Sequence, residues 1–270
     1  MLRFISFGSG SSGNCYFLFT EHDGLMVDAG VGVRSLKKFF RDYGLSMAQI
    51  HHLLITHDHA DHIKCVGSMS HDYHLTVTTT AAVHKGIDRN YCVTRKIAPE
   101  LRAVITPGER VQMGDFLVTP FSVPHDSSDN VGYMIEAGGT NLCIMTDVGH
   151  VTDDMGSYIT KSENLVIEAN HDLEMLMSGP YPQFLKERIT SGTGHLNNTL
   201  CGEAVARNMS ERLKNVWLCH LSEENNHPEL ARKTVESVLR SYGVVVGKDL
   251  KLDVLKRTVP TGIFDLHVES

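Results

Sequence analysis

The sequence predicts an α/β protein in which helices cover the outer faces of β-sheets. Short apolar segments bounded by turn residues recur along the chain, and amphipathic helical segments are interspersed among them. Because the two kinds of segment are intermingled throughout, we expect packed layers around a shared core. The chain has 270 residues, which fit one large domain or two small ones, and 41% of them are hydrophobic, which is ample for a substantial core. We expect a single domain over residues 1–270.

Up to residue 169, the chain is predicted to contain short strands and a helix over residues 33–43. In that helix the apolar side chains recur at helical spacing, and Gly44 follows as a C-cap. The segment from His51 to Thr56 contains an apolar run typical of a buried strand. The other strands are expected at residues 2–7, 15–20, 24–28, 75–80, 116–123, 131–137, 141–146 and 164–169.

The remainder of the chain is predicted to be more helical. A helix is expected over residues 197–213, and a strand over residues 215–219 follows it. Pro228 opens a second helix, which reaches about Tyr242 before a glycine ends it. A last strand at about residues 250–256 is expected to close the chain.

Composition argues against several classes of protein. No apolar run approaches the roughly 18 residues of a membrane span, and no charged-then-apolar leader precedes the first expected strand. The six cysteines form no C-x-x-C pair, which argues against a zinc ribbon. Free thiols are the simpler interpretation, and they indicate a cytoplasmic location. The formal net charge of −7 disfavours a sequence-reading nucleic-acid binder, whereas the 16 histidines raise the question of a metal.

The segment Thr56-His57-Asp58-His59-Ala60-Asp61-His62 carries the strongest chemical signal. It follows a buried strand directly, and four groups that can ligate a metal fall within six residues: His57, His59, Asp61 and His62. One ion cannot easily take all four ligands from so short a segment, but two adjacent ions can. The alternative is a solvated turn, which the density of ligands and the apolar strand beside it disfavour.

A site for two ions needs ligands from elsewhere in the chain, at strand ends that converge. Three residues fit, because each is the first ionisable residue after an expected strand: His125, Asp147 and His220. Any one of them alone is more easily explained as a structural strand-end residue. Together with the 57–62 segment, they favour a metal site.

These residues occur in the order of the motifs of the metallo-β-lactamase fold superfamily, and nearly the whole chain resembles that superfamily. Asp28, in Met-Val-Asp-Ala-Gly, matches its first motif, and the 57–62 segment matches its second. His125, Asp147 and His220 match the third, fourth and fifth motifs. The resemblance implies a four-layer αββα sandwich.

The same resemblance implies how the ligands divide between two divalent ions. It gives His57, His59 and His125 to one ion and Asp61, His62 and His220 to the other. Asp147 would bridge both, and Asp28 would be a buried carboxylate that supports the ligands. Zinc, manganese and iron all accept histidine and carboxylate ligands, so the identity of the metal stays open.

Such a site is suited to hydrolysis. Two ions about 3.5–4 Å apart can share a hydroxide and stabilise the leaving oxygen. Asp61 is a candidate general base for that water. The redox di-iron branch of the superfamily carries a glutamate where His59 stands, which argues against redox chemistry. The β-lactamases themselves differ at His62, which argues against β-lactamase activity.

Glu168 and His195 narrow the reaction further. Glu168 ends an apolar strand, and His195 lies in Ser-Gly-Thr-Gly-His just before a helix. Alone, the first is explained as a buried ion-pair partner and the second as a loop histidine. Together they resemble a pair in the nuclease branch that includes RNase Z, where the glutamate orients a histidine that contacts the scissile phosphate and protonates the leaving oxygen. A phosphodiester needs such an acid more than a thioester does.

Two further segments resemble the WalJ/YycJ group, whose members are regarded as DNA-directed 5′→3′ exonucleases. They are Phe7–Asn14, which is rich in glycine and serine, and His220–Pro228. Ser11, Ser12 and Asn14 are candidate phosphate contacts, because such a loop presents amide and hydroxyl groups to an anion. The alternative is a tight turn between two strands.

A basic segment over residues 85–102 is a candidate contact for the nucleic-acid backbone. It includes Arg95 and Lys96, with Tyr91 as a possible stacking aromatic, although a solvated surface explains it equally well. The leading function is therefore a dinuclear phosphodiesterase that attacks DNA through its backbone and ends. The acidic charge favours the alternative, a hydrolase of small cyclic phosphodiesters or thioesters on the same fold. A non-catalytic regulator is disfavoured by the complete ligand set, and no membrane partner is expected.

Overall fold

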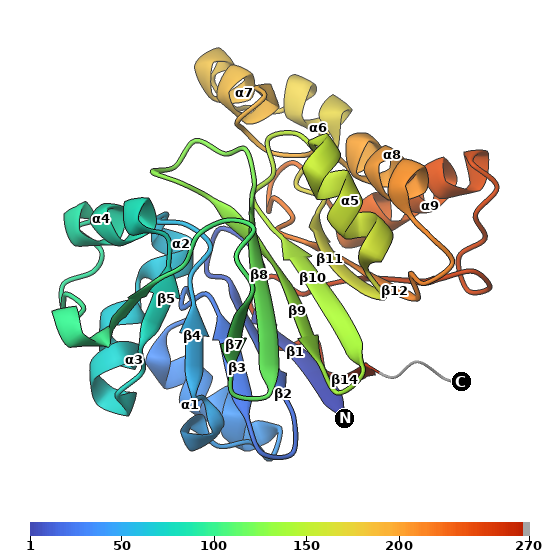
Figure 1. Cartoon of the computed structure of the whole chain (residues 1–270). Coiled ribbons are helices and arrows are strands. Elements are labelled where there is room, and N and C mark those ends of the chain that lie inside the picture. Colours follow the sequence, from blue (N-terminus) through green and yellow to red (C-terminus); the bar gives the residue numbers. More distant parts are fainter. Residues whose placement is uncertain (267–270) are drawn as a thin grey trace.

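The computed structural model, which describes residues 1–266, contains two seven-stranded sheets with helices on their outer faces (Figure 1). This confirms the α/β class and the layered arrangement that the sequence predicts. The first sheet has the order β14-β1-β2-β3-β4-β5-β6 and the second β13-β12-β11-β10-β9-β8-β7. In each sheet one half is parallel: β3 to β6 in the first, and β10 to β13 in the second.

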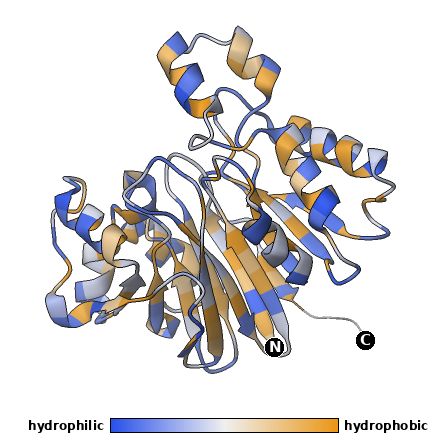
Figure 2. Ribbon diagram, turned by 45° about the horizontal axis from the view of Figure 1, so that its top comes forward, coloured by the Kyte–Doolittle hydropathy of each residue, from blue (hydrophilic) through white to orange (hydrophobic). Residues whose placement is uncertain are grey.

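The strands of the first sheet are β1 (Leu2–Gly8), β2 (Cys15–Phe19), β3 (Gly24–Val27), β4 (His52–Leu54), β5 (Val77–Thr79), β6 (Arg102–Val104) and β14 (Ile263–Leu266). Those of the second are β7 (Val111–Met113), β8 (Phe116–Ser122), β9 (Val131–Ala137), β10 (Thr140–Met145), β11 (Asn164–Glu168), β12 (Asn215–Cys219) and β13 (Lys251–Val254). Most are apolar along their length, as Figure 2 shows, because both faces of each sheet are covered.

The helices fall into two groups, with one pair standing apart. The first-sheet side has α1 (Val33–Asp42), α2 (Ala60–Ile63), α3 (Val66–Tyr73), α4 (Ala81–Arg89) and the short 3₁₀ turns η1 (Met47–Gln49) and η2 (Pro99–Leu101). The second-sheet side has α5 (Asp153–Lys161), α8 (Asn198–Asn208) and α9 (Pro228–Ser241). The pair α6 (Leu173–Ser178) and α7 (Gln183–Thr190) projects beyond the strand ends, at the top of Figure 1.

Three buried apolar clusters separate the four layers. The middle cluster lies between the sheets and joins Phe4 and Leu54 of the first to Ile144 and Trp217 of the second. A second cluster packs α1, α3 and α4 on the first sheet, and the third packs α5, α8 and α9 on the other. The sandwich therefore has the order helix, sheet, sheet, helix, as the family resemblance implies.

Two predicted elements differ from the structure. The strand near residues 250–256 is β13, but it is not the last strand, because the chain crosses to the other sheet and adds β14 antiparallel to β1. The helix predicted over residues 197–213 ends at Asn208. Met209 is extended there, and the Ser210 hydroxyl donates to the Thr160 carbonyl, so the chain leaves the helical path.

Two further findings, on the cysteines and on the length of the helices, apply to all the residues that the structure describes. All six cysteines, which lie within residues 1–266, are free thiols. No helix in the same range is long and apolar enough to cross a bilayer.

Three loops at the carboxyl ends of the strands are joined through their main chains. The Asn14 amide donates to the Asp61 carbonyl at 2.8 Å, and the Ala29 amide donates to the His62 carbonyl at 2.7 Å. Gly30 sits between them, and a Cβ atom there would lie 1.6 Å from the Asp61 carbonyl oxygen. The loop after β3 can therefore approach the 57–62 segment only with glycine at this position.

We expect Gly30→Ala to destabilise the protein by about 2 kcal/mol or more, because the added methyl group overlaps a main chain that cannot yield cheaply. Thermal unfolding measures this as a midpoint lower by at least about 4 °C. Gly32→Ala is the matched control, since nothing lies within 4 Å of its Cβ position. Equal midpoints for the two variants would contradict the close-packing argument.

Candidate metal centre

The predicted ligands come together at one edge of the sandwich, where the strands of both sheets end. The segment 57–62 follows β4, and His125 follows β8. Asp147 follows β10, and His220 comes directly after β12. The expectation that strand-end residues converge is therefore met by the fold.

Three site residues adopt an unusual backbone conformation. Asp28, Asp147 and His220 have φ angles of 64°, 55° and 53°, in the left-handed region that non-glycine residues rarely occupy. Each stands one or two residues after a strand, so the left-handed residue breaks the extended path there. Strain of this kind is typical of functional sites.

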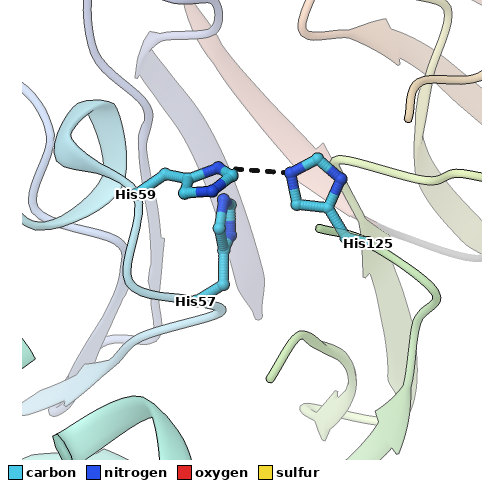
Figure 3. A group of neighbouring side chains, drawn as sticks. All are labelled: His57, His59 and His125. Carbon is cyan, nitrogen blue, oxygen red and sulfur yellow. Dashed lines mark hydrogen bonds between the residues drawn. The ribbon is translucent and has the colours of Figure 1, made fainter. Parts of the chain in front are cut away.

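The first group of candidate ligands is His57, His59 and His125 (Figure 3). The His125 Nε2 atom lies 3.2 Å from the His59 Nδ1 atom, and the His57 ring centre is 4.7 Å from that of His59. Facing nitrogens on three separate imidazoles are the arrangement that transition metals bind.

The second group is Asp61, His62 and His220. Asp61 Oδ2 lies 3.3 Å from His220 Nε2 and 3.5 Å from His62 Nε2. The three side chains come from α2 and from the end of β12, so the two halves of the sandwich meet here.

Asp147 lies between the two groups. Its Oδ2 atom is 3.2 Å from His62 Nε2, while its Oδ1 atom is 3.7 Å from His125 Nε2 and 4.0 Å from His57 Nε2. Its Oδ1 atom also lies 3.5 Å from His220 Nδ1, so the carboxylate has histidines of both groups within 4 Å.

In four of the five candidate histidines, Nδ1 is bonded to a fixed oxygen. The partners are Thr56 Oγ1 for His57, Asp28 Oδ2 for His62, the Gly194 carbonyl for His125, and Glu168 Oε1 for His220. These contacts span 2.7–3.0 Å and leave Nε2 of each ring facing the cluster. Metal-binding histidines are oriented in this way by outer hydrogen bonds.

Asp28 positions the ligands through hydrogen bonds. It is fully buried, and besides His62 it accepts hydrogen bonds from the Thr56 amide at 2.8 Å and the Thr56 hydroxyl. Its carboxylate fixes both the loop that starts the 57–62 segment and the ring of His62.

Glu168 and His195 are in contact, as the resemblance to the nuclease branch implies. His195 Nδ1 lies 2.8 Å from Glu168 Oε1, and the other glutamate oxygen accepts from the Val148 and Leu196 amides. Burial alone would raise the pKa of Glu168, but the charge and hydrogen bond of His195, with the bond from His220, lower it to about 2. Glu168 is therefore an ionised carboxylate.

The site fits a divalent cation by its own chemistry. His57 Nε2 is buried and has no hydrogen-bond partner within the described chain. Burial and the neighbouring His62 charge lower the pKa of His57 well below its usual value, so the ring is neutral, as a ligand must be. Burial would also lower the pKa of His62, but the carboxylates of Asp147, Asp28 and Asp61 raise it to about 10, which shows a surplus of negative charge.

The candidate phosphate contacts occupy different positions. Ser11 and Ser12 are exposed in the loop after β1. Asn14 is fully buried, and its side-chain nitrogen Nδ2 lies 2.9 Å from His62 Nε2 and 3.2 Å from Asp61 Oδ2. Its contacts are thus with the candidate ligands themselves.

Arg95 and Lys96 have partners within the chain. The Arg95 guanidinium lies 2.6 Å from Asp72, and Lys96 Nζ donates to the Asn90 carbonyl at 2.8 Å. The structure does not bring either residue against the ligand cluster.

Some connections at the site were missed by sequence reasoning. Glu168 serves His220 as well as His195, and Asn14 reaches the ligands themselves. The ion pair of Arg188 with Asp126 ties α7 to the residue after His125. No local pattern signals these contacts, because each joins segments far apart in the chain.

Comparison with known proteins agrees with the geometry. The beta-lactamase superfamily domain matches residues 24–220. The chain therefore belongs to the beta-lactamase superfamily, and its fold and ligand cluster make it a metal-dependent hydrolase.

Two curated relatives are similar over most of their length. The exodeoxyribonuclease YycJ of Bacillus anthracis is 32% identical over 97% of this chain and 98% of its own. The exodeoxyribonuclease WalJ of Streptococcus pneumoniae is 33% identical over 90% of each. Within the superfamily, the chain thus falls in the YycJ/WalJ group. Among solved structures, YhfI of Bacillus subtilis shares the fold, with a TM-score of 0.70, 16% identity, and coverage of 96% of this chain and 98% of its own.

We expect His59→Ala to lower the content of bound divalent metal by at least half, because it removes one inward-facing nitrogen. Elemental analysis of the purified protein measures this. Dialysis of the wild type against a chelator should also lower its thermal midpoint, since an ion that binds the folded state stabilises it.

His71→Ala is the matched control, because His71 is also half-buried but bonds only to the Lys96 carbonyl. Full metal content in His59→Ala, or equal loss in both variants, would contradict the assignment.

Proposed function

We propose that this protein is a DNA exonuclease that hydrolyses phosphodiester bonds in the 5′→3′ direction. Two divalent ions, of zinc, manganese or iron, would be held by the two ligand groups, with Asp147 between them. The whole chain would act as one hydrolase domain, since the ligands come from both halves of the sandwich. The names of YycJ and WalJ and the resemblance of the 7–14 and 220–228 segments support DNA as the substrate.

The observation that carries the proposal is the position of His195. Its ring centre lies 5.1 Å from that of His125 and 5.4 Å from that of His220, so it adjoins both ligand groups. Its Nδ1 is engaged by Glu168, and its side chain retains 18% exposure. Nε2 makes no hydrogen bond within the described chain, which leaves it available to a substrate.

His195 is suited to donate a proton. Burial would lower the pKa of its ring, but the charge of Glu168 and their hydrogen bond outweigh burial and raise it. The raised pKa favours the protonated form of the imidazole. As water adds to phosphorus and the bond to the leaving oxygen breaks, Nε2 can give its proton to that oxygen.

Asp61 is placed for the opposite task. Burial would raise the pKa of its carboxyl, but the His62 charge and the hydrogen bond from His220 lower it, so the group is ionised and can accept a proton from water. Divalent ions bound in such a site supply Lewis-acid charge and lower the pKa of water to about 7. Ser11 and Ser12, exposed beside the ligand loops, are proposed to contact the phosphate backbone.

We expect His195→Ala to slow hydrolysis of linear DNA by about 100-fold or more, because the leaving oxygen loses its proton donor. Release of acid-soluble nucleotide with Mn²⁺ present measures the rate, and a 5′-labelled duplex should lose its label first. The metal content should stay at the wild-type level. His195 is a cleaner test than Glu168, whose loss would also free His220.

His150→Ala is the control, because His150 bonds to the same loop, at the Gly192 carbonyl, without touching the ligands. Loss of metal from His195→Ala would contradict the role of proton donor. The net charge of −7 favours a small substrate, so turnover of a cyclic phosphodiester without any degradation of DNA would instead support the alternative hydrolase.

A further inference from the structure

A recess of about 270 Å³ lies directly beside the metal-binding segment and takes no part in the site described above. It is lined by the C-terminal end of α4 and the residues after it, by Asp58, and by Ser128. Three of its lining residues, Arg89, Asn90 and Tyr91, are consecutive in the sequence.

The recess is fixed to the ligand loop by hydrogen bonds. The Asn90 side chain donates to the Asp58 carbonyl at 2.8 Å, and Asp58 stands between His57 and His59. The Asp58 carboxylate accepts from the Ser128 amide at 3.0 Å and from its hydroxyl at 2.7 Å. A Cβ atom on Gly86 would lie 1.9 Å from Asp58 Oδ2. Only glycine at this position therefore lets α4 pack so closely against the Asp58 side chain.

Arg89 differs from the other arginines of the basic segment. Arg95 pairs with Asp72, and Arg102 binds both oxygens of Asp88. Arg89 is exposed and makes no ion pair with any residue from 1 to 266. Its guanidinium is therefore the one in this segment that is available to an anion.

Tyr91 is the most exposed large apolar residue of the described chain. The residue is 92% exposed, although an aromatic ring of this size usually gains from burial. An exposed ring beside an unpaired arginine combines a stacking surface with a phosphate ligand, which is the pairing that single nucleic-acid strands require.

We propose that Arg89 and Tyr91 form a nucleotide subsite that holds the DNA strand next to the scissile bond. Arg89 binds a backbone phosphate, and Tyr91 stacks on an unpaired base. The bond from Asn90 to Asp58 sets the distance between this nucleotide and the ligands. This subsite rests on the proposed function, and it would select single-stranded ends of nucleic acid over small diesters.

The test compares two substrates. Arg89→Ala and Tyr91→Ala should each lower kcat/KM for a DNA with a single-stranded end by roughly 5- to 100-fold, mainly through KM. Turnover of bis(4-nitrophenyl) phosphate, which is too small to reach the subsite, should not change. Tyr91→Phe should retain DNA activity because it keeps the stacking ring.

A binding measurement gives a readout besides activity. In Tyr91→Trp, the new indole should be quenched by an oligothymidylate, whereas the native Trp217 is buried and gives a constant background. Arg89→Ala should also reduce the slope of log affinity against log salt by about 0.7. Arg95→Ala is the matched control, since it removes an exposed arginine that is already paired.

The outcomes separate the two proposals. Wild-type cleavage of DNA with both alanine variants within twofold of it would overturn the subsite and leave the nuclease intact. Equal losses on both substrates would also overturn it, because they would indicate a structural role. A wild type that hydrolyses only the small diester would overturn the proposed function, and the subsite with it.

Discussion

The apolar contact between the two sheets is the constraint on which the rest of the structure depends. Leu54 at the end of β4 and Ile144 near the end of β10 belong to the same buried cluster. Because this cluster aligns the two sheets, the loops that follow strands in each half open at one edge. Without this alignment Asp61, from the first half, would not meet His220, from the second. Packing between the sheets thus determines where chemistry is possible.

The polar site built on that edge is organised largely by the protein itself. Main-chain hydrogen bonds join the loops after β1, β3 and β4, and left-handed residues redirect the chain where the ligands lie. A left-handed non-glycine residue costs on the order of 1 kcal/mol, which the surrounding structure must offset. Hydrogen bonds to Nδ1 then fix four of the histidine rings. A metal ion would therefore find its ligands oriented in advance, and their mutual repulsion is what its charge would relieve.

The sequence predicted those parts of the molecule that depend on local pattern. Strongly apolar strands such as β9 and β11 were found almost to the residue, and the density of ligands at 57–62 was evident without a fold. The strand β14 was missed because it is short and half-exposed at an edge, so it lacks a clear apolar run. The contact of Asn14 with His62 could not be predicted, since it depends on how two turns pack. Glu168 was recognised by resemblance, but its second partner, His220, required coordinates.

The distribution of charge bears on how an acidic chain would act on a polyanion, as proposed above. The net charge is −7, and three arginines are paired with carboxylates of the chain: Arg95 with Asp72, Arg102 with Asp88 and Arg188 with Asp126. A surface of this kind offers no broad positive field to hold duplex DNA along its length. In the proposed nuclease, attraction would instead be local, at bound cations and at Arg89, which makes no ion pair within residues 1–266. Local attraction suits the capture of one strand end, because an end can enter a recess that the middle of a duplex cannot. The acidic composition, which argues against a sequence-reading DNA binder, is therefore compatible with an exonuclease.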